Sequence, residues 1–311
     1  METYNMGSIK KTRAVRWIGR GGVLTALLLS LTLRGAGAVA MGAPGVVATI
    51  DVGGSPFDVA VNPATDRAYV VHSDSVSVID TGSNAVVATI DVGTNLSDVA
   101  VNPATDRAYV VNGPSDSVSV LDTHRNTVVA TIRMGKSPDS IAVDQAAGRA
   151  YVTNVDSDSV SVIDTGRNTV VATIGVGKRP LGVAVNPTAN RAYVTNVASN
   201  SVSVIDTRGN AVVATIGVGK SPYNVAVNPA TDRAYVANND DKNVSVIDTR
   251  SNAVVATIGV GDSPYDVAVN PATDRAYVVN YDSNSVSVLN ISRNADLDTH
   301  RHAHLRRSAP R

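Results

Sequence analysis

The sequence predicts an all-β fold built from six repeats of four short strands. Three observations support this prediction: the string Val-Val-Ala-Thr-Ile recurs along the chain, a tyrosine within Arg-Ala-Tyr-Val recurs at intervals of 40 or 42 residues, and each repeat divides into four runs rich in β-branched residues. The recurring tyrosines are Tyr69, Tyr109, Tyr151, Tyr193, Tyr235 and Tyr277. Segments with apolar residues at helical spacing are absent from the repeats.

The fifth repeat illustrates the four expected strands, at 223–228, 233–238, 244–248 and 254–258. Clusters of Asn, Pro, Asp, Ser and Gly bound each of them, as expected for turns. The turn between the first and second strands has Asp, Asn or Gly at its penultimate position, and these residue types tolerate a left-handed backbone. A positive φ is therefore predicted at Asp66, Asp106, Gly148, Asn190, Asp232 and Asp274.

The repeat length indicates how the strands assemble, because four strands in about 42 residues is the period of a β-propeller blade. The array begins with a fourth-strand sequence at 46–50 and ends, after 286–290, with three strands that lack a fourth. A ring would remove the open sheet edges that this arrangement leaves. We therefore expect a β-propeller of six four-stranded blades and 24 strands, closed by the N-terminal strand 46–50, which completes the last blade.

Residues 1–40 have the features of a secretory signal peptide. A basic region of five Lys and Arg residues precedes the apolar stretch 21–33, and Ala38-Val39-Ala40 is a small-residue cleavage pattern. The apolar stretch is shorter than the ~20 residues that span a bilayer. Cleavage after Ala40 and a secreted, extracellular or periplasmic location are predicted, with an uncleaved anchor as the alternative. The propeller is expected at 41–290 and a basic, His-containing tail at 291–311.

Composition narrows the possible chemistry. The chain has no Cys, which excludes disulfides and thiolate ligands, and its only Glu is Glu2. Formal net charge is zero over the whole chain, but residues 41–290 contain 16 basic and 24 acidic residues. Such an acidic domain is a poor general binder of nucleic acid, which is therefore disfavoured as a partner.

Few residues in the repeats suggest catalysis or cofactor binding. The only histidines between 41 and 290 are His72 and His124, and we expect both at the surface on opposite faces. Catalytic motifs such as G-x-S-x-G and H-E-x-x-H are absent. The acids of 156–158 and 240–241 could ligate calcium, but turn residues in solvent are the favoured interpretation. The sequence therefore predicts no catalytic residue, no cofactor and no metal site, and the chain is expected to be a binding protein rather than an enzyme.

A candidate ligand-binding face lies where the loops from fourth to first strands and from second to third strands are expected to meet. Variation between repeats concentrates in these loops. Three successive repeats carry a cation there, and aromatic residues follow in several repeats, so an anionic ligand or partner surface is indicated. The candidate residues are Lys136, Lys178, Arg179, Lys220, Phe57, Tyr223, Tyr265 and His72. The residues that follow the cation position align as Phe57, Leu96, Asp139, Leu181, Tyr223 and Tyr265.

The second strands carry a specific resemblance. Tyr-Val-Thr-Asn occurs at 151–154 and 193–196, and Tyr-Val-Val-Asn or Tyr-Val-Ala-Asn occurs in three further repeats. In the first repeat the same four-residue motif ends in His72 instead of Asn. Over 46–290 the chain resembles the YVTN-repeat β-propeller family of secreted bacterial and archaeal proteins. The resemblance implies a propeller fold and a secreted location, and it transfers no catalytic residue. Seven blades are common in that family, so six would be a departure.

Together these features predict a secreted, non-enzymatic β-propeller that serves as a binding or cell-surface interaction scaffold. Its expected partner is a protein, a cell-envelope polymer or an anionic ligand on the loop face, and the chain is expected to be a monomer. Two alternatives remain open at this stage. One is a lactonase-like hydrolase or lyase with its site at the channel mouth, and the other is an accessory subunit of a periplasmic redox system.

Overall fold

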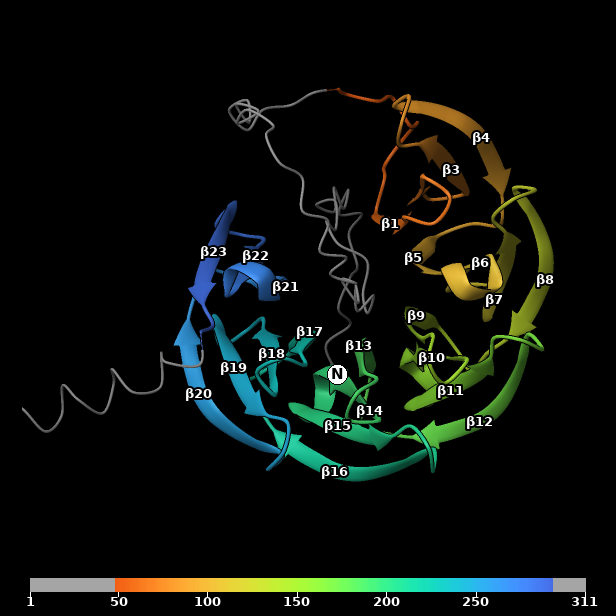
Figure 1. Ribbon diagram of the computed structural model, residues 1–311. Coiled ribbons are helices and arrows are strands. Elements are labelled where there is room, and N and C mark those ends of the chain that lie inside the picture. The colour runs from red at the N-terminus through yellow and green to blue at the C-terminus, as the bar shows by residue number, and fades with distance from the viewer. Residues whose placement is uncertain (1–47, 293–311) are drawn as a thin grey trace, which may run out of the picture.

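The computed structural model describes residues 48–292, which contain 23 strands in six antiparallel sheets (Figure 1). Five sheets have four strands and the last has three, so the all-β prediction and the blade-like repeat are confirmed. We call the sheets blades 1 to 6 in chain order.

The strand boundaries follow the repeat closely. Blade 1 holds β1 (Asp58–Asn62), β2 (Arg67–Val71), β3 (Ser75–Asp80) and β4 (Ala85–Asp91), and blade 2 holds β5 (Leu96–Asn102), β6 (Arg107–Asn112), β7 (Ser117–Asp122) and β8 (Thr127–Arg133). Blade 3 holds β9 (Pro138–Asp144), β10 (Arg149–Asn154), β11 (Ser159–Asp164) and β12 (Thr169–Gly175), and blade 4 holds β13 (Pro180–Asn186), β14 (Arg191–Asn196), β15 (Ser201–Asp206) and β16 (Ala211–Gly217). Blade 5 holds β17 (Pro222–Asn228), β18 (Arg233–Asn238), β19 (Asn243–Asp248) and β20 (Ala253–Gly259), and blade 6 holds β21 (Pro264–Asn270), β22 (Arg275–Asn280) and β23 (Ser285–Asn290). Four 3₁₀ turns occupy loops: η1 (Pro103–Thr105), η2 (Val155–Ser157), η3 (Val197–Ser199) and η4 (Pro271–Thr273).

Each complete blade is a meander in which the strands pair in chain order. The first strands β1, β5, β9, β13, β17 and β21 contact one another in sequence and lie nearest the centre of the arrangement in Figure 1, whereas the fourth strands lie at the rim. The blades are thus arranged around a centre lined by their first strands.

The turns between first and second strands have the predicted left-handed residue. Asp66, Asp106, Asn190, Asp232 and Asp274 have φ between 50° and 55°. Gly148 has φ 61° at the same position. All six predictions of positive φ are therefore confirmed, at positions occupied by residue types that tolerate this backbone region.

The apolar core lies between blades rather than within them. One cluster joins Tyr151 and Val162 of blade 3 to Val183, Ala192 and Val194 of blade 4, and equivalent clusters join the other consecutive blades from 1 to 6. The repeated tyrosine also crosses this interface. The Tyr109 hydroxyl donates to the carbonyl oxygen of Thr165 at 3.2 Å, and the Tyr151 hydroxyl donates to that of Thr207 at 3.4 Å.

A carboxylate stabilises the turn after each third strand in blades 1 to 5. In blade 2, Asp122 accepts hydrogen bonds from the backbone N–H groups of His124 and Arg125 and pairs with the Arg107 guanidinium at 3.2 Å. The N–H group of Arg125 is the main cause that lowers the pKa of Asp122, and that of Gly209 likewise lowers the pKa of Asp206. Asn290 replaces this acid in blade 6.

We expect this set of carboxylates to make the protein labile in acid. Because the folded pKa values lie below the unfolded value of about 3.9, their stabilisation is fully present above that pH and is lost as pH falls through the folded values. The thermal midpoint should therefore decline below about pH 4. Asp206→Asn should flatten this decline by removing one titrating group. A midpoint independent of pH between 5 and 2.5 would contradict the prediction.

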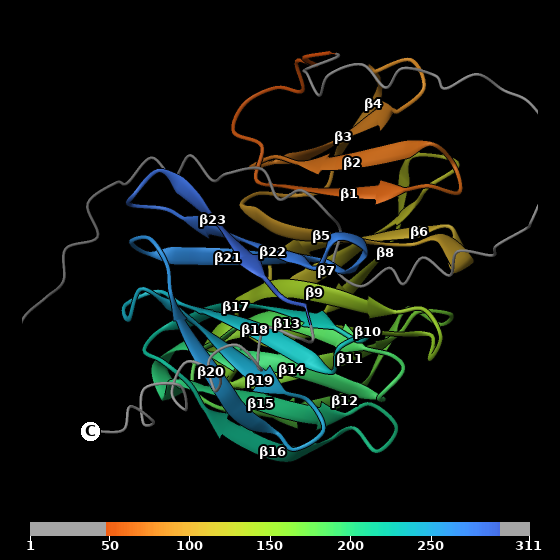
Figure 2. The ribbon, with the colours of Figure 1, turned by 60° about the vertical axis from the view of Figure 1, so that its left-hand side comes forward.

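The predicted closure by 46–50 is not shown. The last sheet has three strands, residues 48–50 are not in a strand, and the six blades form an open arc whose first and last members stand apart in Figures 1 and 2. The side chain of Ile50 packs instead on Ala68, Val70 and Ile79 of blade 1. The predicted signal peptide and tail lie outside the described residues.

Candidate functional site

The loops that enter the first strands lie against the loops between second and third strands, as predicted. The N–H group of Lys136 donates to Ser157 Oγ at 2.7 Å, and the N–H group of Ser137 donates to Asp116 Oδ1 of the preceding blade at 2.8 Å. Equivalent bonds join Arg179 to Asp158 at 2.9 Å and Ser221 to Asn200 at 3.0 Å. We call the surface formed by these two sets of loops the loop face.

The loop face carries the four predicted cations. Lys136, Lys178, Arg179 and Lys220 are all exposed and lie on blades 3, 4 and 5 in succession. Lys178 Nζ is 2.7 Å from Asp158 Oδ2, and this hydrogen bond holds the pKa of Asp158 below its usual value. Among residues 48–292, no ion pair within 4.0 Å involves Lys136, Arg179 or Lys220. Three of the four cations can therefore bind an external anion without breaking an existing ion pair.

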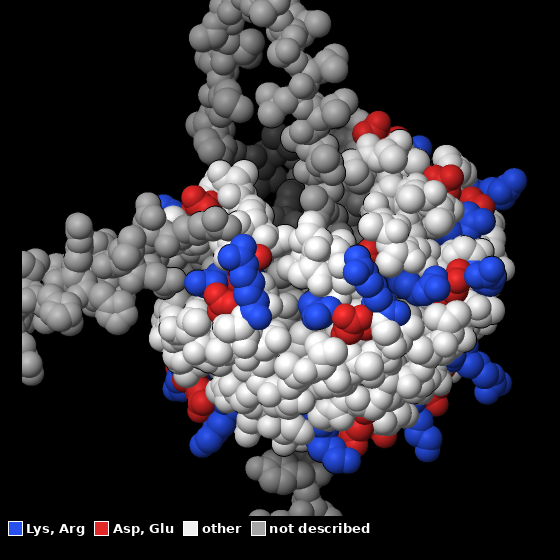
Figure 3. Space-filling view, turned by 60° about the horizontal axis from the view of Figure 1, so that its bottom comes forward, with Lys and Arg blue, Asp and Glu red and all other residues white. Residues whose placement is uncertain are grey.

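Acidic side chains of the same loops accept hydrogen bonds from the neighbouring loops. The hydroxyl of Ser137 donates to Asp156, that of Ser221 donates to Asp240, and the N–H group of Lys220 donates to Asp241 Oδ2 at 2.8 Å. Within the described part of the chain, no three His, Cys, Asp or Glu side chains group as metal ligands. Figure 3 shows basic and acidic side chains interspersed over one side of the molecule.

Aromatic side chains line part of the centre. Tyr223 and Tyr265 occupy equivalent positions on β17 and β21, and their ring centroids are 5.1 Å apart at an interplanar angle of 49°. The half-buried Phe57 precedes β1 at the same repeat position. The alignment of Leu96 with these residues is wrong: Leu96 is 3% exposed and pairs with Asn112, as Pro138 pairs with Asn154.

Ser97 is the residue that occupies the aromatic position in blade 2. Its hydroxyl donates to the carbonyl oxygen of Asp139 at 2.7 Å. The second repeat has Asn95-Leu96 where four others have Ser-Pro and one has Arg-Pro, and this substitution conceals the correct alignment. The central position is thus aromatic or apolar in blades 1, 4, 5 and 6 and polar in blades 2 and 3.

His72 does not lie at the surface, contrary to the prediction. It is 2% exposed, with Nε2 2.9 Å from Ser77 Oγ and Nδ1 3.2 Å from the carbonyl oxygen of Gly54. The buried position follows from the repeat, because His72 replaces the Asn that ends the other second strands, and those Asn side chains are also buried. His72 is therefore removed from the candidate face. His124 is exposed, as predicted, and its Nε2 lies 3.2 Å from Asp106 Oδ1.

The acids next to the central positions bind neighbouring blades. Asp58 Oδ2 accepts from the N–H group of Val99 at 3.1 Å, and Asp98 Oδ2 accepts from Ser140 Oγ at 2.7 Å and from the N–H group of Ile141 at 3.0 Å. Both carboxylates are nearly buried. The sequence analysis missed this role, although the repeated Asp-Val at 58–59 and 98–99 signals it.

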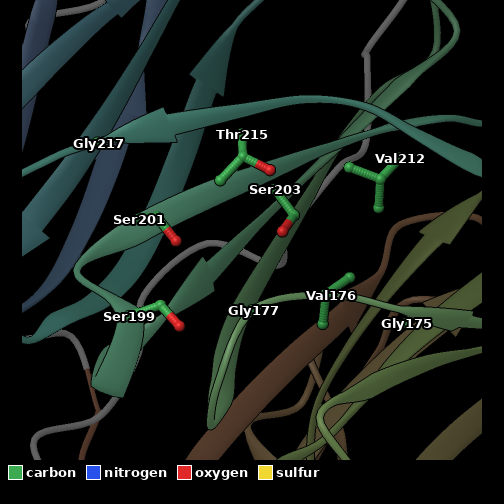
Figure 4. Close-up of a pocket in the computed structure, with 9 residues that line it drawn as sticks. All are labelled: Gly175, Val176, Gly177, Ser199, Ser201, Ser203, Val212, Thr215 and Gly217. Atoms are coloured by element: carbon green, nitrogen blue, oxygen red, sulfur yellow. The ribbon is translucent and has the colours of Figure 1, made fainter.

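A groove of about 450 Å³ lies between blades 3 and 4, next to Lys178, whose N–H group donates to the lining residue Ser199 Oγ at 2.7 Å. Figure 4 shows Ser199, Ser201 and Ser203 of blade 4 facing the segment that carries Val176 and Gly177. A Cβ at Gly175 or Gly217 in its lining would meet nothing within 4 Å, whereas one at Gly177 would meet Asn196. Beneath it, Asn196 Nδ2 donates to Ser201 Oγ at 3.2 Å and to Ser203 Oγ at 3.0 Å.

Comparison with solved structures identifies the fold. The chain is similar to a structure described as hydrazine synthase from Kuenenia stuttgartiensis, with a TM-score of 0.52 and 20% identity over 76% of this chain and 96% of that chain. It is also similar to a functionally unknown protein from Desulfotomaculum acetoxidans DSM 771, with a TM-score of 0.66 and 19% identity over 76% and 83% of the two chains. No model of a protein family and no curated protein matches the sequence. At these identities the similarity shows a propeller-like fold.

No helix within residues 48–292 has the length and apolar character needed to cross a membrane.

Proposed function

We propose that this protein is a secreted, YVTN-type β-propeller that binds an anionic ligand on its loop face without chemical turnover. The observation that carries the proposal is the arc of exposed cations on three consecutive blades, with Lys136, Arg179 and Lys220 making no ion pair to described residues. A fold of this kind hosts many functions, so the residues of the site carry the argument and the fold does not.

The arrangement of the acids favours binding over catalysis. General acid–base chemistry needs carboxylates that can reach a substrate, but Asp58 and Asp98 are engaged by backbone N–H groups of the next blade. Asp156 and Asp240 accept hydrogen bonds from loop serines. Among the charged side chains in the loops that enter β9, β13 and β17, Lys136, Arg179 and Lys220 are exposed and form no ion pair with residues 48–292.

Tyr223 and Tyr265 add an apolar, planar element beside the cations. Their rings are in contact and half-buried, which leaves part of each face accessible. Aromatic side chains supply contact area at low conformational cost, and cations supply long-range attraction. Together they suit an anionic ligand that also has apolar or ring-shaped parts, such as an acidic cell-envelope polysaccharide.

Replacing Lys136, Lys178 and Lys220 together by Ser is expected to weaken binding of an anionic polymer. Each exposed ion pair contributes about 0.2–1 kcal/mol, so the dissociation constant should rise roughly tenfold. Polygalacturonate and dextran sulfate are suitable probes, measured by isothermal titration calorimetry at 50 mM and 200 mM salt. The wild-type affinity should fall with salt, whereas the triple variant should depend on salt less.

A matched control removes three cations from the opposite face. Arg125, Arg167 and Arg208 lie in the turns between third and fourth strands of blades 2, 3 and 4 and are exposed. Their replacement by Ser changes net charge equally and should leave the affinity near the wild-type value. Equal losses in both triple variants would show that only net charge matters and would refute the proposed site.

A further inference from the structure

The face of blade 6 that carries Tyr277 is exposed, whereas the equivalent face of each preceding blade is covered by the next blade. Tyr277, Val286 and Val288 are 38%, 55% and 58% exposed. Their equivalents in blade 5 are Tyr235, Val244 and Val246, which are 3%, 0% and 7% exposed. In blades 1 to 5 the next blade covers these positions, so blade 6 presents an apolar face of the kind that packs against another blade.

Blade 1 presents the complementary face. Between blades 3 and 4 the tyrosine side of one blade packs on Val183, Ala192, Val194 and Ile205 of the next. The equivalent residues of blade 1 are Val59, Ala68, Val70 and Ile79, and within residues 48–292 no preceding blade covers them. Ile50 and Val52 are the described residues that pack on this cluster.

Ile50 and Val52 already make contacts that the end of a fourth strand makes in other blades. In blade 1 the fourth-strand residue Ile90 and the following Val92 pack on blade 2, as Ile50 and Val52 pack on blade 1. The carbonyl oxygen of Val92 accepts from Ser119 Oγ at 3.4 Å, and that of Val52 accepts from the equivalent Ser77 Oγ at 3.0 Å. The segment therefore sits on blade 1 as the fourth strand of a preceding blade would.

Polar groups on the two faces are complementary as well. The Tyr69, Tyr109 and Tyr151 hydroxyls each donate to a Thr carbonyl of the next blade, and the residue equivalent to that Thr for Tyr277 is Thr81. Asp116, Asp158 and Asn200 each accept from an N–H group of the next loop, and the equivalent pair at the opening is Asn284 with Ser55.

We infer that blades 6 and 1 join within one chain, with residues 48–50 pairing to the edge of β23. The register follows from β19 and β20, where Val244, Ser245 and Val246 pair with Ile258, Thr257 and Ala256. The equivalent pairs are Val286 with Ile50, Ser287 with Thr49 and Val288 with Ala48. This joining buries the apolar face and pairs the exposed edge of the last sheet.

The joining also extends the central aromatic group. Tyr223 and Tyr265 are in contact because they occupy equivalent positions on consecutive blades. Phe57 occupies that position in blade 1, so it would become the neighbour of Tyr265. Three consecutive aromatic side chains would then line the centre beside blades 5, 6 and 1, adjoining the cations of blades 3 to 5.

Paired cysteines test this inference directly, because the chain has no native Cys. The variants are Ala48→Cys with Val288→Cys and Thr49→Cys with Ser287→Cys in the full chain. Residues that pair directly in antiparallel strands have Cα atoms about 4.5 or 5.5 Å apart, which is within the range that a disulfide spans. Mild oxidation of dilute protein should consume both thiols and give a monomer with altered mobility on non-reducing electrophoresis.

Two matched control variants show how readily a correctly paired and a misaligned pair of cysteines oxidise. Val246→Cys with Ala256→Cys places the same pair inside blade 5 and should oxidise readily. Ser287→Cys with Ile50→Cys shifts the register by one residue, which points the two side chains to opposite faces, and should not oxidise. Thiols that stay free in both test variants would overturn the inference. Disulfides between two chains would also overturn it and would show that a second copy fills the opening.

Discussion

Replacing Tyr151 by Ala should lower the free energy of unfolding by about 3–5 kcal/mol, the range for large aromatic side chains removed from a core. Tyr151 is fully buried in the cluster between blades 3 and 4, and its hydroxyl donates to the Thr207 carbonyl at 3.4 Å. Burial also raises the pKa of Tyr151 to about 12. Urea denaturation followed by circular dichroism measures the loss.

Tyr151→Phe is the control for this prediction. It keeps the ring and removes only the hydrogen bond to Thr207, so it should cost about 0.5–1.5 kcal/mol. The difference between the two variants isolates the packing of the ring across the interface. If Tyr151→Ala were no worse than Tyr151→Phe, the interface between blades would not carry the stability assigned to it.

Gly177→Ala should also destabilise the protein, by about 1–3 kcal/mol, because it forces an atom into filled space. A Cβ at Gly177 would lie 2.6 Å from Cγ and 2.8 Å from Cβ of Asn196 in the next blade. Asn196 is fully buried and is held by Ser201 and Ser203, so it has little room to move. A shift in the urea midpoint measures the effect.

Gly175→Ala is a matched control two residues earlier, where a Cβ would meet nothing within 4 Å. Its stability should equal or slightly exceed that of the wild type, since Ala restricts the unfolded chain. In an Asn196→Ala background, Gly177→Ala should cost less than it does alone, because the obstructing side chain is gone. Additive losses would show that the two residues do not clash.

The sequence predicted those features of the fold that depend on residue type and period. Left-handed turns at Asp232 and its equivalents follow from the tolerance of Asp, Asn and Gly for positive φ. The four strands of each repeat follow from short β-branched runs between turn residues. These properties are local, so neighbouring residues suffice to reveal them.

Features that depend on contact between blades were harder to predict. Lys178 and Asp158 lie 20 residues apart and meet only because the loop of one blade rests on that of the next. His72 was placed at the surface by its residue type, although its position in the repeat is buried. Comparison with the Asn that ends other second strands would have corrected this, because position in the repeat determines burial more strongly than polarity does.

The uniform interfaces between blades have a consequence at the level of the gene. Each of the five interfaces uses equivalent residues, so a blade contributes one tyrosine face and one complementary face wherever it stands in the chain. Duplication or deletion of one 42-residue unit changes the number of blades but leaves every remaining interface intact. An insertion of another length would leave unmatched strands and faces. Copy number can therefore vary by recombination between repeats while the side chains of each loop diversify independently.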